Sequence, residues 1–252
     1  MVFGSLKSIF TMDVKEHYDK HLANFYAWMT GDFDKQTASF RSFLQDHFII
    51  PTSSGLAVDL GAGHGIQTVA LVQQGFKVTA IDFNEKLLQE LKDTTKDLPV
   101  ITVLDDITAI KNHIQTNPEL VICCGDTIAH LNSDTTIEQL LRDIAHVLDK
   151  NGKLILSFRD YSVERKGDQR FIPVKSDTDR ILTCILDYEE THVRVTDLLY
   201  THTQEGWIPT VSSYQKVRVT AAMMRHLLEQ TGFVIQIDTV IQHMIYMIAS
   251  KQ

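Results

Sequence analysis

Short apolar runs alternate with helix-like patterns along the middle of the chain, from about residue 55 to residue 160. Runs of this length and composition are typical of strands that are buried in a parallel sheet. We expect such strands at 56–60, 77–81, 100–103, 120–124 and 153–158. Because strands that alternate with helices build βαβ units, the pattern predicts an α/β fold with a parallel sheet.

Helix signals fill the segments between these strands. A helical pattern follows the first strand and ends at Gly75, a residue suited to a helix C-terminus. Asn84 is placed to cap the helix that follows the second strand. Before the fifth strand, apolar positions keep helical spacing over 133–150, and Thr135 and Glu138 have the spacing of a capping box.

The pattern changes after the fifth strand. An antiparallel insertion is indicated by β segments without intervening helices at 181–188, 192–203 and 210–219. A seven-stranded core sheet is then completed by a helix at 220–230 and by strands at 233–239 and 244–250. Helices are also expected upstream, at 13–28 and 34–48, where they would cover the carboxyl edge of the sheet. Open α/β sheets bind their ligands at that edge.

Composition and charge narrow the function classes. Of 252 residues, 44% are hydrophobic and 22% charged, as in ordinary globular proteins. The formal net charge of -8 disfavours nucleic acid, whose binding depends on clustered Lys and Arg. No stretch approaches the roughly 18 apolar residues that cross a bilayer, and the N-terminal apolar positions are too loosely spaced for a signal peptide. Because three cysteines cannot form a disulfide framework, we expect a cytoplasmic protein without a membrane partner.

A glycine-rich segment, Asp-Leu-Gly-Ala-Gly-His-Gly, occupies positions 59–65 directly after the first strand. Glycines there let the backbone turn sharply and approach a ligand closely. The dinucleotide-binding pattern needs a further glycine at position 66, where Ile66 stands. Asp82 closes the second strand, where a carboxylate can accept hydrogen bonds from both hydroxyls of a ribose. Together these features favour a nucleoside-like cofactor.

Four motifs in order resemble class I S-adenosylmethionine-dependent methyltransferases. They are the segment 58–65, Asp82 at the end of the second strand, Asp105-Asp106-Ile107 after the third, and the turn at 150–153 before the fifth. The resemblance covers most of the chain. It implies a Rossmann-like seven-stranded sheet, S-adenosyl-L-methionine as the cofactor and no metal.

The resemblance also implies roles for single residues. The glycine loop would contact the methionine moiety, Asp82 the ribose, Asp106 the adenine amine and Ile107 the adenine face. The cofactor-binding set is then Asp59, Gly61, Ala62, Gly63, Asp82, Phe83, Asp106, Ile107 and Cys124. We expect an N-terminal helical cap (1–50), a cofactor-binding core (51–162), the antiparallel insertion as a substrate chamber (163–219) and a C-terminal helix with the last two strands (220–252).

Two further segments are similar to glycine N-methyltransferase and its small-molecule relatives. In segment 121–131, Asp126 replaces the family's asparagine and His130 belongs to the closing Ala-His-Leu. Arg159, at the exit of the fifth strand, occupies the position of the arginine that holds the substrate carboxylate. The resemblance implies Asp126, His130 and Arg159 as catalytic-site residues. Met29 and Gln36 depart from the family's tyrosine and arginine, which argues against glycine itself.

Each of these residues has a structural alternative. Asp126 suits a substrate amine, but Asp is also favoured as a helix N-cap at the end of a strand. Arg159 suits a carboxylate or a surface ion pair. His130 is either a base or a packed histidine. The set of Tyr18, Phe25, Tyr26 and Met29 consists either of core residues or of a lid over the methyl donor.

The sequence therefore predicts a methyltransferase that moves a methyl group to a nitrogen or oxygen of a small molecule. Asp126 and Arg159 together favour a molecule that resembles an amino acid. Two alternatives remain. One is a cofactor-binding protein with this fold and no catalysis, and the other is an NAD-dependent oxidoreductase, which would carry the third glycine and a second mononucleotide half. The apolar N-terminal segment through Phe10 leaves a homo-oligomer open.

Overall fold

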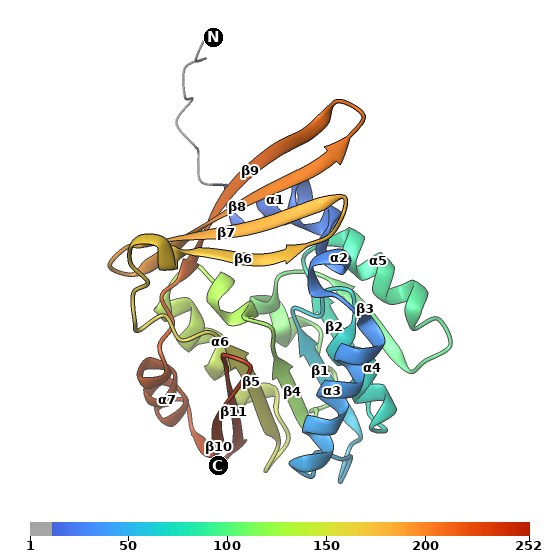
Figure 1. Ribbon diagram of the computed structural model, residues 1–252. Coiled ribbons are helices and arrows are strands. Elements are labelled where there is room, and N and C mark those ends of the chain that lie inside the picture. Colours follow the sequence, from blue (N-terminus) through green and yellow to red (C-terminus); the bar gives the residue numbers. More distant parts are fainter. Residues whose placement is uncertain (1–11) are drawn as a thin grey trace.

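A computed structural model describes residues 12–252, so the apolar N-terminal positions through Phe10 lie outside the described part. The chain forms a seven-stranded sheet and a four-stranded sheet (Figure 1). The order in the larger sheet is β10-β11-β5-β4-β1-β2-β3. Its strands are β1 (Leu56–Leu60), β2 (Lys77–Asp82), β3 (Val100–Leu104), β4 (Leu120–Cys123), β5 (Lys153–Phe158), β10 (Phe233–Ile241) and β11 (Met244–Lys251).

Five adjacent strands, β5, β4, β1, β2 and β3, run parallel, as the sequence predicts. β1 pairs with β2 on one side and with β4 on the other, and β11 returns antiparallel to β5. Every predicted strand of this sheet is present, with bounds that differ by two residues at most. The prediction succeeds because these runs are apolar on both faces, which is what a strand covered by helices on both sides requires.

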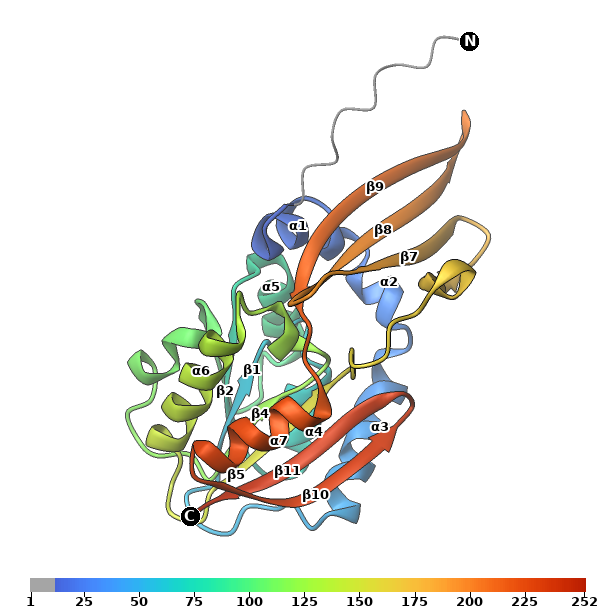
Figure 2. The ribbon, with the colours of Figure 1, turned by 90° about the vertical axis from the view of Figure 1, so that its left-hand side faces the viewer.

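Helices cover both faces of this sheet (Figure 2). One layer holds α3 (Phe33–Asp46), α4 (Ile66–Gln73) and α5 (Glu85–Thr94), and the other holds α6 (Asp134–Val147) and α7 (Ala221–Gln230). α3 lies on a face of the sheet, because its apolar stripe, which includes Phe40 and Leu44, packs with Ala70 and Leu71 of α4. The expectation that the 34–48 helix covers the carboxyl edge is therefore wrong.

Local capping signals are partly confirmed. Asn84 caps α5 and accepts a hydrogen bond from the backbone N–H of Leu87 at 3.0 Å. The capping box at Thr135 and Glu138 is wrong, because Ser133 caps α6 and accepts from the N–H of Thr136 at 3.1 Å.

The helix predicted over 13–28 is broken into three short elements. They are α1 (Val14–Lys20), a 3-10 turn η1 (Leu22–Asn24) and α2 (Tyr26–Thr30). The breaks fall at His21 and Phe25, whose φ values of -132° and -135° are not helical. α1 and α2 do lie at the carboxyl edge of the sheet, as expected (Figure 1).

The antiparallel insertion after β5 is confirmed and contains one more strand than predicted. It consists of β6 (Phe171–Ser176), β7 (Arg180–Tyr188), β8 (His192–Thr203) and β9 (Gly206–Val217), in that order. The sequence misses β6 because it is an exposed edge strand that contains Pro173 and lacks alternation. The insertion stands over the carboxyl edge of the main sheet (Figure 2). Among residues 12–252, no helix is long and apolar enough to cross a membrane.

Candidate active site

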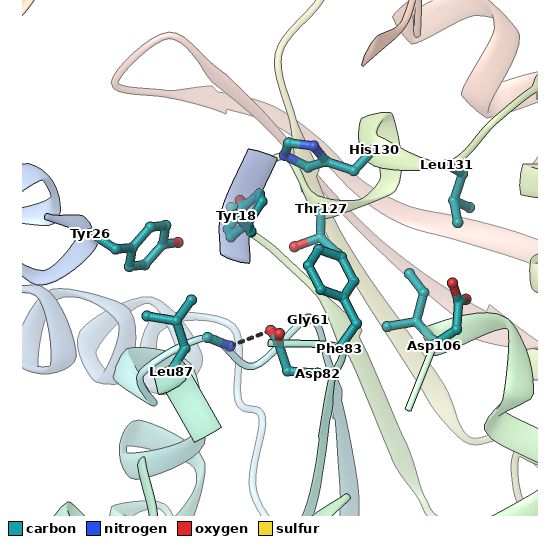
Figure 3. A pocket seen from close by; sticks show the side chains of 13 residues that line it. Tyr18, Tyr26, Gly61, Asp82, Phe83, Leu87, Asp106, Thr127, His130 and Leu131 are labelled. Carbon is teal, nitrogen blue, oxygen red and sulfur yellow. Dashed lines mark hydrogen bonds between the residues drawn. The ribbon is translucent and has the colours of Figure 1, made fainter. Parts of the chain in front are cut away.

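A pocket lies at the carboxyl edge of the main sheet, beneath α1 and α2 (Figure 3). Its floor comes from the ends of β1, β2, β3 and β4, which the parallel register brings to one edge. The lining residues are Tyr18, Tyr26, Gly61, Gly63, Asp82, Phe83, Leu87, Asp106, Ile107, Gly125, Thr127, His130 and Leu131. Seven of the residues that the sequence singles out therefore meet in one cavity: Gly61, Gly63, Asp82, Phe83, Asp106, Ile107 and His130.

Two of the three glycines in the loop face this pocket. Gly61 has φ of 73°, and a Cβ there would lie 2.3 Å from Cγ2 of Thr127, so no side chain fits. Gly63 has φ of 54° and also lines the pocket. Gly65 serves another purpose, because a Cβ there would lie 2.4 Å from Cδ1 of the buried Leu91. The third glycine thus permits packing between α4 and α5.

The Asp82 carboxylate is held rigidly at the centre of the pocket. Its Oδ2 accepts a hydrogen bond from the N–H of Gly63 at 2.8 Å (Figure 3), and its Oδ1 accepts one from the N–H of Asn84, also at 2.8 Å. Burial raises the pKa of Asp82, while these two backbone donors lower it. Because each carboxylate oxygen accepts about two hydrogen bonds, each keeps capacity for one ribose hydroxyl. The carboxylate therefore fits the nucleoside of the predicted cofactor.

The far end of the pocket suits a flat heterocycle. Ile107, Leu87 and Phe83 supply apolar surface, and Asp106 stands exposed beside them. Oδ1 of Asp106 accepts from the N–H and the hydroxyl of Thr108, at 2.8 and 2.6 Å, and so caps the short helix η2 (Ile107–Asn112). The other oxygen of Asp106 makes no hydrogen bond within residues 12–252 and is available for an amine.

Three residues of the predicted cofactor set do not line the pocket. Asp59 lies beneath the loop, where Oδ2 accepts from the hydroxyl of Thr68 at 2.6 Å. Burial raises the pKa of Asp59 to about 7, although the hydrogen bond from Thr68 opposes the shift. Ala62 packs in a core cluster with Leu88 and Leu91, and Cys124 is buried in the layer beneath α3 and α4. Their cofactor contacts stay predictions.

Tyr18 and Tyr26 close the pocket from the side of the N-terminal helices (Figure 3). The ring of Tyr18 meets that of Phe83 edge-on at 5.3 Å and that of Tyr26 at 6.1 Å between centroids. Of the four residues predicted as a lid, these two line the pocket and Phe25 and Met29 do not, although all four belong to one apolar cluster. That they cover the methyl donor stays a prediction.

Asp126 occupies the N-cap position of the 3-10 helix η3 (Thr127–His130), with φ of 74°. Its side chain makes no capping hydrogen bond to this helix and is buried in a cluster of donors instead. Its oxygens accept from the N–H and Nη1 of Arg159, from the Tyr161 hydroxyl and from Nζ of Lys216. Burial alone would raise the pKa of Asp126, but the cations Lys216 and Arg159 lower it to about 2.

Arg159 pairs with this buried carboxylate and not with a surface acid. Nη1 lies 3.3 Å from Oδ2 of Asp126, while 57% of the arginine side chain stays exposed. Within residues 12–252, Nε and Nη2 of Arg159 have no hydrogen-bond acceptor, so one edge of the guanidinium is free for a ligand. The sequence reasoning missed Lys216. A signal existed, because Lys216 shares the inward face of β9 with Tyr214, and a charge at such a position is unusual.

His130 lines the pocket between Tyr18 and Tyr214, with ring centroids 5.6 Å from each. Its Nδ1 is buried without a hydrogen-bond partner. Burial, and next the positive charge of Lys216, lower the pKa of His130 well below its ordinary value, so the imidazole is neutral. His17 and His21, which are four residues apart in the sequence, are not joined by a third side chain that could complete a metal site. No group of three His, Cys, Asp or Glu side chains in the described part of the chain could hold a metal ion.

Comparison with known proteins agrees with this geometry. Residues 57–152 match a family described as a methyltransferase domain. A glycine/sarcosine N-methyltransferase from Aphanothece halophytica is 30% identical over 129 residues, which cover 49% of either chain. A glycine N-methyltransferase from Homo sapiens is 27% identical over 161 residues, which are 58% of this chain and 54% of that one. The chain thus spans about half the length of the curated relatives it matches.

Solved structures share the whole architecture. The CalS10 structure, an amino pentose methyltransferase from Micromonospora echinaspora with S-adenosylmethionine bound, has a TM-score of 0.73 at 11% identity and covers 92% of this chain and 97% of that one. At that identity the likeness shows the fold alone. The matched domain, the curated relatives and the shared fold lead to one conclusion. The chain contains a class I S-adenosylmethionine-dependent methyltransferase domain that is distantly related to the glycine and glycine/sarcosine N-methyltransferases.

Proposed function

We propose that this protein is an S-adenosylmethionine-dependent methyltransferase that methylates a nitrogen, or an oxygen, of a small carboxylate-bearing molecule. The proposal that the substrate bears a carboxylate rests on the free guanidinium edge of Arg159. The same guanidinium contacts Asp126 through Nη1, and the neighbours of Asp126, Gly125 and Thr127, line the cofactor pocket. A planar guanidinium matches a carboxylate in a bidentate fork. Relatives named for glycine, sarcosine and amino pentose methylation are consistent with a small substrate.

When bound, the cofactor supplies a methyl group that its sulfonium charge already activates. The chain's own residues then orient and enclose the reactants. Asp82 and Asp106 would hold the nucleoside at its ribose and at its adenine and so orient the cofactor. Tyr18 and Tyr26 would exclude water from the bound cofactor. The neutral His130, with an unpartnered Nδ1, is suited to accept a hydrogen bond from the methyl acceptor.

The alternative function, an NAD-dependent oxidoreductase, is less well supported than the methyltransferase. Ile66 takes the place of the third dinucleotide glycine, and Gly65 serves helix packing. The other alternative, a protein that binds the cofactor but transfers no methyl group, differs from the proposed enzyme only in that it forms no methylated product. A cytoplasmic location and a homo-oligomer stay predictions.

Two measurements separate these classes. Calorimetric titration with S-adenosylhomocysteine and with NAD should give binding of the first compound only. A library of amines, amino acids, hydroxy acids, sugars and phenols is then incubated with a labelled methyl donor, using wild type and Arg159→Ala in parallel. We expect the best substrate to carry a carboxylate, and Arg159→Ala to lower its kcat/KM at least tenfold. Cofactor binding without any labelled product would identify a binding protein instead.

A further inference from the structure

The insertion places a buried cation next to the presumed methyl-acceptor site. Lys216 lies on β9 with 7% of its side chain exposed, and its Nζ lies 2.6 Å from Oδ2 of Asp126, of which 1% is exposed. Removing two charges from water costs several kcal/mol per ion unless the pair is close and well hydrogen-bonded. The two side chains therefore form a fixed internal ion pair.

This ion pair leaves no room at Asp126 for a substrate ammonium. An ionised carboxylate has about four lone-pair sites. Asp126 receives four hydrogen bonds from the chain itself: from the N–H of Arg159 at 3.0 Å, Nη1 of Arg159 at 3.3 Å, the hydroxyl of Tyr161 at 3.0 Å and Nζ of Lys216 at 2.6 Å. Oδ2 receives three of these bonds and Oδ1 one, and only 1% of the Asp126 side chain is exposed. The carboxylate is therefore enclosed by the chain and charge-paired with Lys216, and it is not open to a substrate ammonium.

The charges around this point sum to one positive charge. Lys216 and Arg159 are cations, and Asp126 is the anion between them. Tyr161 and His130 are neutral, because burial raises the pKa of the tyrosine and lowers that of the histidine. The excess positive charge belongs to Arg159, the half-exposed member of the cluster.

Asp197, a buried carboxylate on the inner face of the insertion, contacts neither Lys216 nor Arg159. It pairs across the strands with Ser212, four residues from Lys216 on β9. Its Oδ1 accepts a hydrogen bond from Sγ of Cys184 at 2.9 Å, and its Oδ2 lies 3.2 Å from Nε2 of His17 on α1. Asp197 therefore belongs to the contacts between α1 and the insertion and not to the Asp126 cluster.

We propose that Lys216 determines which ionic form of the methyl acceptor binds. By neutralising Asp126 from within, it makes the chamber select an anion: a carboxylate on Arg159 and an uncharged nitrogen or hydroxyl as the methyl acceptor. An ammonium has no lone pair with which to attack a methyl group, so a site that does not stabilise the ammonium favours the reactive form. An amino acid must then lose a proton to bind, whereas a hydroxy acid need not. This inference rests on the proposed function.

The test measures binding of matched pairs to the protein loaded with S-adenosylhomocysteine. Glycolate is compared with glycine, and 3-phenyllactate with phenylalanine, by titration calorimetry between pH 6.5 and 9. For at least one pair we expect the hydroxy acid to bind at least tenfold more tightly at pH 7. The affinity of its amino acid should rise about tenfold per pH unit, because one proton is released on binding. Equal affinities, a preference for the amino acids, or no binding of any member would overturn the proposal.

Charge variants test the role of Lys216 itself. Lys216→Met leaves the negative charge of Asp126 without its Lys216 partner. The affinity for the amino acid should therefore rise at least tenfold relative to the affinity for the hydroxy acid. Asp126→Asn leaves Lys216 unpaired and should tighten hydroxy acid binding. The double variant Asp126→Asn/Lys216→Met again has one excess positive charge and should regain the wild-type preference. Lys166→Met, at an exposed position of the insertion, is the matched control and should change nothing.

These outcomes are distinguishable from a failure of the proposed function. Binding of S-adenosylhomocysteine is measured first on each variant, and the acceptor titrations need no turnover. If Lys216→Met does not fold, the comparison of Asp126→Asn, the double variant and wild type still decides. The proposal expects the double variant to prefer the hydroxy acid, because its net charge at this point equals that of the wild type. A double variant that prefers the amino acid would therefore overturn the proposal.

Discussion

At the scale of single residues, Asp82 combines binding with support of the glycine loop. Asp82→Ala should weaken binding of S-adenosylhomocysteine by about 1.5–3 kcal/mol, the usual loss for hydrogen bonds to a charged group. The N–H groups of Gly63 and Asn84 also lose their acceptor, so we expect the free energy of unfolding to fall by about 1–2 kcal/mol. Calorimetry and urea unfolding measure the two effects, with Asp93→Ala as an exposed control. Unchanged cofactor affinity in the folded variant would refute the ribose assignment.

The buried carboxyl group of Asp59 should make the free energy of unfolding depend on pH. Its pKa is about 7 in the folded protein, because of burial, and near 3.8 when unfolded. Between these values the folded state binds more protons, so the contribution of Asp59 to stability falls as pH rises from about 4 to 7 and stays low above 7. Asp59→Asn removes this penalty and keeps an acceptor for Thr68. It should raise the free energy of unfolding by about 1–3 kcal/mol at pH 8, and by less at pH 5.

Urea unfolding of wild type and Asp59→Asn at both pH values checks this expectation. Asp46→Asn, at an exposed end of α3, is the control, and its effect should not depend on pH. If Asp59→Asn destabilises the protein equally at pH 5 and pH 8, the buried carboxylate is not the source of the pH dependence.

At the scale of elements, the glycine loop divides its work between binding and packing. Gly63 and Gly65 both have positive φ, so alanine at either costs about 1 kcal/mol in backbone strain. Gly65→Ala adds an overlap with Leu91, which should bring the loss of stability to about 2–4 kcal/mol. Gly63→Ala places its Cβ in the pocket and should mainly weaken S-adenosylhomocysteine binding. The reverse ranking in calorimetry and urea unfolding would contradict this division. The double variant Gly65→Ala/Leu91→Ala should lose less stability than the sum of the two single variants, because Leu91→Ala removes the overlap.

The elements also show which features a sequence reveals. β1 to β5, Asn84 as a cap and the loop with Asp82 carry local signals, namely apolar runs, a cap residue and glycines at a strand end. β6 carries none, because an exposed edge strand has no buried face to produce alternation. The role of Lys216 depends on Asp126, 90 residues away, and no local pattern encodes that pairing. Contacts between distant segments therefore account for what the sequence leaves open at the site.

At the scale of the whole molecule, α1 connects the cofactor pocket to the insertion. Towards the core, Asp19 accepts a hydrogen bond from Nδ2 of Asn84 at 2.7 Å. Towards the insertion, the fully buried His17 pairs through Nδ1 with the hydroxyl of Ser212 at 2.7 Å and stacks on Tyr214 at 4.1 Å. Tyr18, the next residue, lines the pocket. The helix that carries Tyr18 is thus anchored to the insertion as well as to the core.

This connection makes His17 a test of how the two halves of the site depend on each other. His17→Ala removes the contacts to Ser212 and Tyr214 and leaves the contact of α1 with Asn84 intact. We expect the free energy of unfolding to fall by about 2–4 kcal/mol, as for other buried aromatic side chains. We also expect S-adenosylhomocysteine to bind about tenfold more weakly, about 1.4 kcal/mol, because Tyr18 is no longer held over the pocket. His226→Ala, at an exposed position of α7, should alter neither value. A folded His17→Ala protein with wild-type cofactor affinity would mean that contacts to the core alone position the lid.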